Sequence, residues 1–417
     1  MSTKLLAVLA VLGVVSSVSA GEDEVLPVPP RERPGAVTPV PGPTPALDST
    51  PLALGPTPAV PGGPWFGPEP ALMFDSGPHG DARVYGRAEF LLWWMRDTEL
   101  PPLLTTGPLA GTVVVGNEQL DTDAHAGGRA TLGVWLVDPQ SLALETRYFQ
   151  LERRSAERTV SSPGDPILTR PFFDVAADQE NVAFIAFPNF SAGDFAVKGS
   201  SELWGTEVNV AGRLVTVYAG RLDVLAGFRY LELSESLDLI AVNRFAPGVG
   251  GGRLTVLDSF GADSRFYGGQ VGLNGEVQVG RWFVTARGQV ALGGTDQIVR
   301  VRGASTLTAP SGASISSPNG LLALPSNIGR SSDSEFSVVP ELGINLGYAV
   351  TEQLRVHVGY NLLYWTHAVR AADQIDPVLN FTQFNPGGPV GPIRPAVPFT
   401  DDDFWVQGLT FGVEFIW

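Results

Sequence analysis

Alternating apolar and polar residues dominate the chain from about residue 82 to its end. Successive side chains of a β-strand point to opposite faces, so this alternation predicts strands with one apolar and one polar or small face. We expect about ten strands, and most are long enough for the roughly 9–11 tilted residues that cross a bilayer. They are predicted at residues 84–95, 128–137, 142–152, 198–210, 219–233, 264–279, 281–294, 335–348, 353–366 and 404–417. Twelve strands stay possible if Val182–Phe187 and part of a later loop pair with each other.

The connections between these strands alternate in length. Short links are expected at 138–140, at 280, at 350–352 and within 211–218. Long polar links rich in Gly and Pro are expected at 97–127, 153–197, 234–263, 295–334 and 367–403. Short periplasmic turns that alternate with long extracellular loops are typical of outer-membrane barrels. The sequence therefore predicts an all-β fold, a single transmembrane antiparallel β-barrel over residues 81–417 with both ends in the periplasm.

The two faces of the predicted strands differ as a lipid-facing wall requires. In the strand at 338–348 one face is apolar, and the other carries Glu341, Asn345 and glycines. The apolar faces carry aromatic residues toward their ends, at Trp94, Tyr230, Tyr267, Tyr348, Tyr364 and Trp417. Aromatic rings are enriched at membrane–water interfaces. A soluble sandwich would show the same alternation, but we would expect its polar face to be richer in Lys and Thr.

The last strand ends on an aromatic residue. Phe411, Val413, Phe415 and Trp417 share one wholly apolar face. An exposed apolar edge invites aggregation, and closing it in a lipid-embedded barrel removes that problem. This ending also resembles the C-terminal signal by which bacterial outer-membrane proteins are recognised for insertion. We therefore predict that the barrel-assembly machinery binds this strand.

The N-terminal 80 residues predict export followed by a spacer. Lys4, a short apolar run and the small residues before Gly21 form a signal peptide (1–20) cleaved after Ala20. Residues 21–80 are crowded with proline, which predicts an extended, disordered spacer. This spacer either contacts the cell wall or has no partner. No apolar stretch is long enough for a transmembrane helix.

Composition narrows the possible partners and chemistry. The chain has no cysteine, which excludes disulfides and thiolate metal sites, and its formal net charge is -16. This charge argues against nucleic acid or anionic lipid headgroups as the main partner. Outer-membrane lipids are the expected surroundings of the barrel.

The polar faces predict a lumen lined by both signs of charge in about equal number. The expected lumen-facing residues are Arg87, Glu89, Arg129, Glu145, Arg147, Glu207, Asp223, Arg229, Glu276, Arg287, Glu341, Arg355, His357 and Glu414. A channel selective for one sign of ion would favour a ring of that sign. A barrel of about ten strands is narrow, so mixed charges are expected to pair across it and fill it.

Candidate catalytic and metal-binding groups are few. Asp121, Asp123 and His125 form an acidic-plus-histidine cluster in the first long loop, and Asp401–Asp403 precedes the last strand. Either cluster could bind a divalent cation through oxygen ligands, but solvated loop residues explain both more simply. His79 and His367 are interpreted as incidental. The sequence therefore predicts no enzyme, no cofactor and no metal site.

Several motifs, in order along the chain, resemble the planctomycete outer-membrane family called putative beta barrel porin-7. They include Phe90–Trp94, Gly127–Trp135, Leu144–Phe149, Glu202–Glu207 and Asn361–Trp365. The resemblance covers nearly everything from about residue 84 to the end and implies an outer-membrane barrel. Family members often carry Cys near the start of the barrel, where this chain has Gly-Pro-His-Gly. The resemblance implies no reaction and no substrate.

Two functions from different classes follow. The first is a porin-like channel for passive diffusion of small hydrophilic solutes. The second is a narrow or plugged structural barrel that displays its loops at the cell surface.

Overall fold

The computed structural model describes residues 83–417, except 97–98, 108–110, 121–122 and 138–140. The predicted signal peptide and spacer, the turn at 138–140, His79 and Asp121 lie outside these residues. Within the described part of the chain, no helix is both long and apolar enough to span a bilayer.

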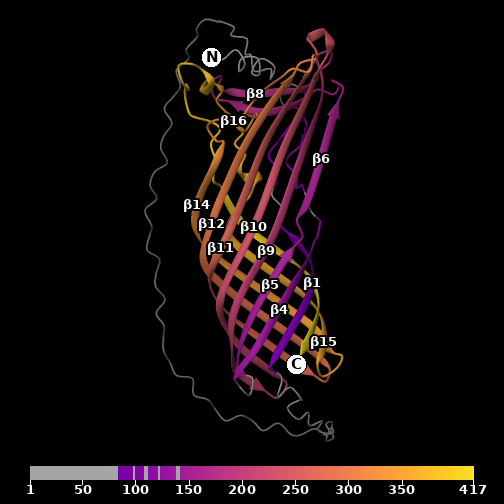
Figure 1. Ribbon diagram of the computed structural model, residues 1–417, viewed down its shortest axis with the longest axis vertical. Helices are drawn as coiled ribbons and strands as arrows, with labels where there is room; N and C mark the ends of the chain where they lie inside the picture. The colour runs from indigo at the N-terminus through magenta and orange to yellow at the C-terminus, as the bar shows by residue number, and fades with distance from the viewer. Residues whose placement is uncertain (1–82, 97–98, 108–110, 121–122, 138–140) are drawn as a thin grey trace, which may run out of the picture. The chain divides into compact units, whose positions relative to one another are not determined.

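Ten antiparallel strands of the described chain close into a barrel (Figure 1). They are β1 (Val84–Met95), β4 (His125–Val137), β5 (Leu142–Leu151), β9 (Ser191–Val217), β10 (Gly220–Phe245), β11 (Arg253–Val279), β12 (Trp282–Thr308), β14 (Gly329–Ala349), β15 (Leu354–Val369) and β17 (Asp401–Ile416). Each strand pairs with the next in this order, and β17 pairs with β1 to close the ring. All ten predicted strands are confirmed. The extra strand considered at Val182–Phe187 instead lies largely in β8 (Gln179–Ala186), in a second sheet.

Four strands of the ring, β9 to β12, are longer than predicted, at 26 or 27 residues each. The expected loop at 234–263 is mostly the hairpin of β10 and β11, with the 3-10 turn η2 (Pro247–Val249) at its tip. With β14 and with β6 (Arg154–Ser162), which pairs with β9, these strands form a tall open wall beyond the closed ring (Figure 1). The prediction of a loop at 234–263 was wrong. The outward face of these strands is polar, so the segment lacks the apolar alternation that marks a lipid-facing strand.

The other long connections fold against the inner face of this wall as a cap. A second sheet contains β2 (Leu104–Thr106), β3 (Val113–Val115), β7 (Leu168–Asp174), β8 and β16 (Val378–Leu379), while β13 (Ser314–Ser317) pairs with β12. The 3-10 turns η3 (Ala372–Gln374) and η4 (Phe381–Phe384) lie in the last connection. Phe172 of the cap packs in one apolar core with Phe195 and Phe260 of the wall. The wall and the cap therefore form one folded layer around a shared core.

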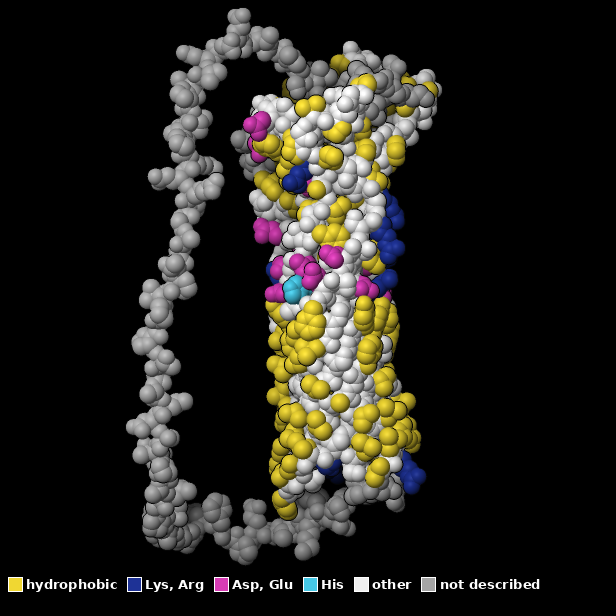
Figure 2. Space-filling view, turned by 90° about the vertical axis from the view of Figure 1, so that its left-hand side faces the viewer, with side chains coloured by type: hydrophobic (Ala, Val, Ile, Leu, Met, Phe, Trp, Pro, Cys, Tyr) yellow, Lys and Arg dark blue, Asp and Glu magenta, His cyan; other side chains and the backbone are white. Residues whose placement is uncertain are grey.

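An apolar belt surrounds the closed part of the barrel (Figure 2). Aromatic residues border it at both ends, which confirms their predicted placement on the outer face. At the cap end the hydroxyls of Tyr230 and Tyr267 donate hydrogen bonds to Glu232 (2.9 Å) and Asp296 (3.0 Å). At the turn end the Trp282 and Tyr348 rings lie 5.0 Å apart. The two tyrosines at the cap end thus have their rings at the apolar belt and their hydroxyls toward polar groups, as an interfacial position requires.

The C-terminal strand completes this belt. Phe411, Val413 and Phe415 on the outer face of β17, and Trp417 directly after it, are between 43% and 51% exposed. Phe411 lies opposite Phe90 of β1, and the backbone NH of Val84 donates to the carbonyl of Trp417 (3.1 Å). The lipid-facing position predicted for these residues is therefore present. Recognition by the assembly machinery stays a prediction.

Candidate functional site

The lumen of the closed barrel brings the predicted polar residues together. All fourteen lie on inward faces; twelve are buried, and Arg87 and Arg287 are half-buried. Inward glycines leave room for large neighbours. A Cβ added at Gly412 would lie 2.3 Å from the His357 ring, and one added at Gly347 would lie 2.1 Å from the Phe283 ring. Small residues on one strand therefore allow bulky residues on the next to fill the interior.

The centre of the lumen is a network of carboxylates and guanidinium groups. Nη1 of Arg147 lies 3.3 Å from carboxylate oxygens of both Glu207 and Glu341, and Arg229 pairs with the same two acids. Arg147 is on β5 and Glu341 on β14, which are five places apart in the ring of ten strands. This contact therefore spans the full width of the lumen. Buried pairs of this kind are tolerated only when other hydrogen bonds complete them.

Further polar contacts extend the network from wall to wall. Nη1 of Arg287 on β12 lies 2.6 Å from Glu145 on β5, and Nε of Arg129 lies 2.6 Å from Glu89. His357 Nε2 lies 3.1 Å from Glu89. The remaining members of the predicted set also have partners in the lumen: Arg355 with Glu276 and Glu414, Arg87 with Glu414, and Asp223 with Arg213.

Some members of the network were not predicted from the sequence. The Tyr85 hydroxyl donates to Glu145 (2.8 Å), and Nη2 of Arg221 lies 3.1 Å from Glu276. Gln289 donates to both Glu207 and Glu341 (3.0 and 2.9 Å). These residues could have been predicted from the alternation along the strands. Tyr85 is on the same face as the predicted lumen residue Arg87, and Arg221 is on the same face as Asp223.

A layer of apolar side chains covers the polar network toward the cap. It includes Leu91, Trp93, Phe149, Leu231, Phe266, Leu363, Trp365 and Phe404, all buried and packed as one cluster. Trp365 is fully buried, with ring centroids 6.2 Å from Phe266 and 6.5 Å from Phe404. Its Nε1 donates to Thr295 (2.9 Å), and the Thr295 hydroxyl donates to Ser337 (2.7 Å). This apolar layer was not predicted from the sequence.

Little space is left on the polar side of this layer. A cavity of about 10 Å³ is lined by residues of both layers, among them Trp93, Arg147, Arg229 and Glu341. A single water molecule needs about 10–15 Å³ of this kind of volume. This cavity therefore has room for about one water and not for a solute.

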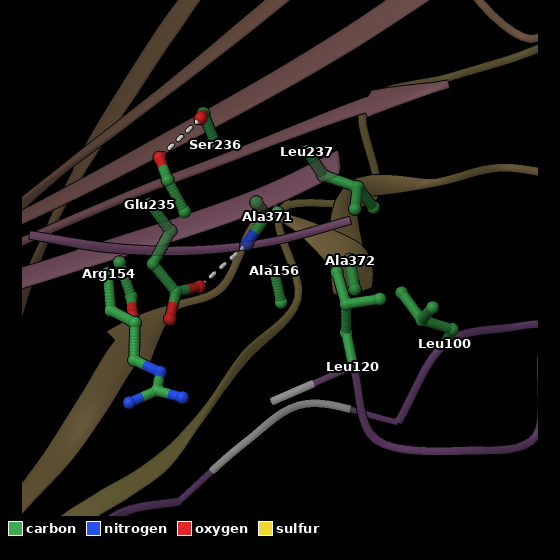
Figure 3. Close-up of a pocket in the computed structure, with 12 residues that line it drawn as sticks. Leu100, Leu120, Arg154, Ala156, Glu235, Ser236, Leu237, Ala371 and Ala372 are labelled. Atoms are coloured by element: carbon green, nitrogen blue, oxygen red, sulfur yellow. Dashed lines mark hydrogen bonds between the residues drawn. The ribbon is translucent and has the colours of Figure 1, made fainter. Parts of the chain in front are cut away.

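A larger cavity, of about 60 Å³, lies on the cap side of the apolar layer (Figure 3). The residues that line it include Glu235 and Leu237 of β10, which follow Leu231 of the apolar layer along the strand. Glu235 accepts a hydrogen bond from the backbone NH of Ala371 (3.1 Å). The apolar layer thus separates this cavity from the polar network.

The sequence matches the family described as Putative beta barrel porin-7 over residues 85–417. The chain belongs to this family. No curated protein matches the sequence. The family and the closed ring together establish a porin-like barrel of the outer membrane. Planctomycete origin stays a prediction.

Solved structures of other outer-membrane barrels are similar over most of their length. The Escherichia coli outer membrane protease OmpT is 9% identical with a TM-score of 0.41, covering 81% of this chain and 97% of that chain. The Pseudomonas putida toluene transporter TodX is 9% identical with a TM-score of 0.21, covering 81% and 89%. A Pseudomonas aeruginosa FadL homologue is 7% identical with a TM-score of 0.22, covering 81% and 90%. Similarities this low carry no information about activity.

Of the two acidic clusters, the structure describes Asp123 and His125 of the first and Asp401–Asp403 of the second. Asp123 pairs with Arg154 (2.5 Å), whereas His125 is buried at the start of β4. Asp402 pairs with Arg96 (2.6 Å). In the described part of the chain, no group of three or more His, Asp or Glu side chains is placed to hold a metal ion.

The segment after β15 crosses the cap end of the lumen. The pairing of β15 with β17 shifts register between Trp365 and Ala368, where His367 has a φ of 59°. Nη2 of Arg370 then lies 2.6 Å from Glu235, and its guanidinium lies 5.3 Å from the Phe404 ring centroid. Gln374 donates to the carbonyl of Thr400 (2.7 Å). These contacts hold the segment against the apolar layer.

Lowering the pH from about 7.5 to about 5 is expected to stabilise this segment. Burial raises the pKa of Asp373 from 3.8 to about 6; Arg370 opposes the rise, and Glu235 and Asp402 add to it. The folded state therefore binds the proton more tightly than the unfolded state. The resulting stabilisation is complete below about pH 3.8 and is lost as the pH rises through about 6.

Amide hydrogen exchange within η3, corrected for the intrinsic pH dependence, measures this effect. Exchange is expected to be slower at the lower pH in the natural protein. In the Asp373→Asn variant the corrected rates are expected to be the same at both pH values. Equal corrected rates in the natural protein would contradict the prediction.

Proposed function

We propose that this protein is a closed structural barrel that holds a folded cap at the cell surface and does not transport solutes. The observation that carries the proposal is the pair of stacked layers in the lumen. One layer is polar and joined across the full width by Arg147 and Glu341. The other is apolar and centred on Trp365.

The two layers oppose permeation for different physical reasons. Ions and hydrophilic solutes lose hydration in an apolar constriction, which acts as a barrier even where a narrow gap exists. In the polar layer, a solute would have to replace contacts that neutralise buried charges. Removing one partner of such a pair costs about 3–5 kcal/mol. Passage through both layers is therefore strongly unfavourable.

The size and packing of the cap support a display role. Its core includes Phe172 and Phe260, and its buried Arg170–Asp258 pair (2.7 Å) joins β7 to the wall. Asp258 also accepts hydrogen bonds from the backbone NH groups of Leu322 and Ala323 (2.8 and 2.9 Å). A folded cap of this kind presents a fixed surface to its surroundings.

Passive diffusion of small hydrophilic solutes is the alternative, and the porin designation of the family favours it. Planar-bilayer conductance of the refolded, full-length protein separates the two functions. We expect no stable open steps above background. Stable steps in most insertions, from protein shown to be folded by its heat-dependent gel mobility, would overturn the closed-barrel proposal.

A double variant sharpens this measurement. Arg287→Ala with Arg355→Ala removes two guanidinium groups from the polar layer and leaves Trp365 in place. Because the apolar layer remains, we expect this variant to stay non-conducting. A conducting variant would show that the charge pairs alone close the lumen. If the natural protein and the variant both gave large conductance steps that differed only in ion selectivity, the lumen of the natural protein would already be open.

The other parts of the proposal concern the surroundings of the barrel. We propose outer-membrane lipids around the belt, insertion by the barrel-assembly machinery through Phe411–Trp417, and contact of residues 21–80 with the cell wall. We further propose that the protein has no catalytic activity and that it is exported with cleavage after Ala20.

A further inference from the structure

Three arginines gather on the outer face of the wall. Arg300 of β12 lies directly opposite Arg330 of β14, and Arg302 follows Arg300 on the same face. Outward positions on both strands are even-numbered, as the exposed residues Leu292 and Phe336 show. The pairing of β12 with β14 has no register shift, so all three arginines are at outward positions. We call Arg300, Arg302 and Arg330 the arginine cluster.

The arginine cluster is short of counter-charge. Arg300 pairs with Asp263 of β11. Arg302 and Arg330 are exposed, and neither has an ion-pair or hydrogen-bond partner among the described residues. Asp296, four residues before Arg300, accepts a hydrogen bond from a tyrosine of the belt. Like charges directly opposite each other on neighbouring strands are destabilising, so an anion bound between the three side chains would remove this repulsion.

The height of the cluster brings it within reach of the membrane surface. Phe336 is 63% exposed at the cap end of the apolar belt. Arg330 lies six residues further along the strand, about 20 Å at 3.3 Å per residue, which a tilt of about 40° reduces to about 15 Å above the belt. Arg302 lies two residues beyond Arg300, which is opposite Arg330, and is therefore about 5 Å higher. Headgroups occupy roughly the first 5–8 Å of this height, and long arginine side chains extend toward them from above. Figure 2 shows acidic side chains and a histidine directly above the yellow belt, with basic side chains gathered mainly along the right-hand edge of the barrel.

We propose that the arginine cluster binds the phosphate of an outer-leaflet lipid headgroup. Guanidinium groups suit phosphate because their parallel N–H donors match its oxygens. The net charge of -16 argues against anionic surfaces as the main partner, but the cluster itself has three arginines and one paired aspartate. The bound lipid would anchor the wall beside the membrane, where β14 extends beyond its pairing with β15, which begins at Glu341.

This inference rests on the outer-membrane location and not on the closed lumen, so the two proposals can fail separately. The test uses the full-length protein refolded in phosphatidylcholine nanodiscs, with phosphatidic acid as the phosphomonoester probe. Binding is measured by native mass spectrometry across a range of phosphatidic acid content. The test variant carries Arg302→Gln and Arg330→Gln, and the matched control carries Arg253→Gln at the far tip of the β10–β11 hairpin.

We expect the double variant to bind phosphatidic acid about 25-fold more weakly, about fivefold for each arginine at an anionic membrane surface. The control should bind within about twofold of the natural protein, because Arg253 lies at the hairpin tip, outside the cluster and farther from the membrane.

Three results would overturn the proposal. Equal binding of phosphatidic acid by the natural protein and the double variant would show that the arginine cluster does not bind the lipid. If the Arg253→Gln control weakened phosphatidic acid binding as much as the double variant, the effect would come from the change in net charge and not from the arginine cluster. Inorganic phosphate that binds as tightly as phosphatidic acid would show a site for free anions and not for a lipid. All three proteins are first compared by heat-dependent gel mobility, so that a failure to fold is not read as a loss of binding.

Discussion

Replacing Glu341 with alanine is expected to destabilise the folded barrel by about 3–5 kcal/mol, the usual cost of removing one partner from a buried ion pair. The Glu341 carboxylate pairs with Arg147 and Arg229 and accepts a hydrogen bond from Gln289. Both arginines are almost fully buried, with side chains 6% and 2% exposed. Without Glu341 they share Glu207 alone, so one positive charge loses its counter-charge in a region that water cannot readily enter.

Urea unfolding of the protein in lipid vesicles, followed by tryptophan fluorescence, measures this loss. Glu335→Ala is the matched control, because Glu335 is an exposed residue of the same strand with no ion-pair partner among the described residues. The control is expected to change the free energy of unfolding by less than about 0.5 kcal/mol. If the two variants proved equally stable, the polar layer would not hold the barrel together.

The ring could be predicted from the sequence because its outer face meets lipid. Val356, Val358 and Tyr360 of β15 alternate with Arg355 and His357, and a lipid-facing strand requires this pattern along its whole length. The inward positions of the charged residues followed from the same alternation. Each strand could therefore be predicted by itself, without knowledge of its neighbours.

The upper parts of the long strands could not be predicted in this way. Leu237, Leu239 and Ala241 form a buried inward face on β10, but the outward residues between them meet water and include Asp238. The segment therefore resembles a polar loop in composition. Its regular pairing depends on the cap that covers its inner face, and the cap is formed by residues far away in the sequence.

The apolar layer was missed for a related reason. Trp93 and Trp94 are adjacent in the sequence, yet Trp93 is buried in the lumen and Trp94 faces outward. Trp93 meets Phe149, and Trp365 meets Phe266, only once the register of several strands is fixed. In the same way, the polar contact between β5 and β14 joins residues 194 positions apart in the chain. Sequence alternation gives the face of a residue but not the height at which it meets its partners.

Ser337 offers the second large effect, because it lies at the apolar layer and the chain has no cysteine of its own. Ser337 is fully buried on the inward face of β14 and accepts a hydrogen bond from Thr295, which in turn accepts one from Trp365. Ser334, on the same strand, is exposed on the outward face. Cysteine is close to serine in size, so Ser337→Cys and Ser334→Cys are expected to leave the fold unchanged.

A membrane-impermeant thiol reagent should react with the two variants at very different rates. A buried thiol reacts only when the structure opens locally, so we expect Ser337→Cys to react at least about a hundredfold more slowly than Ser334→Cys. Adding Trp365→Ala to Ser337→Cys removes the largest side chain of the layer and is expected to restore much of the reactivity. Trp282→Ala, which removes an aromatic residue from the outer belt, is the matched control and should leave the rate unchanged.

The labelling rate of Ser337→Cys, measured in vesicles with reagent added from both sides of the membrane, tests most directly whether the lumen is closed. We predict almost no labelling from either side while Trp365 is present. Rapid labelling of Ser337→Cys, at a rate close to that of Ser334→Cys, would show that water and small solutes reach the middle of the barrel. That result would contradict a closed lumen.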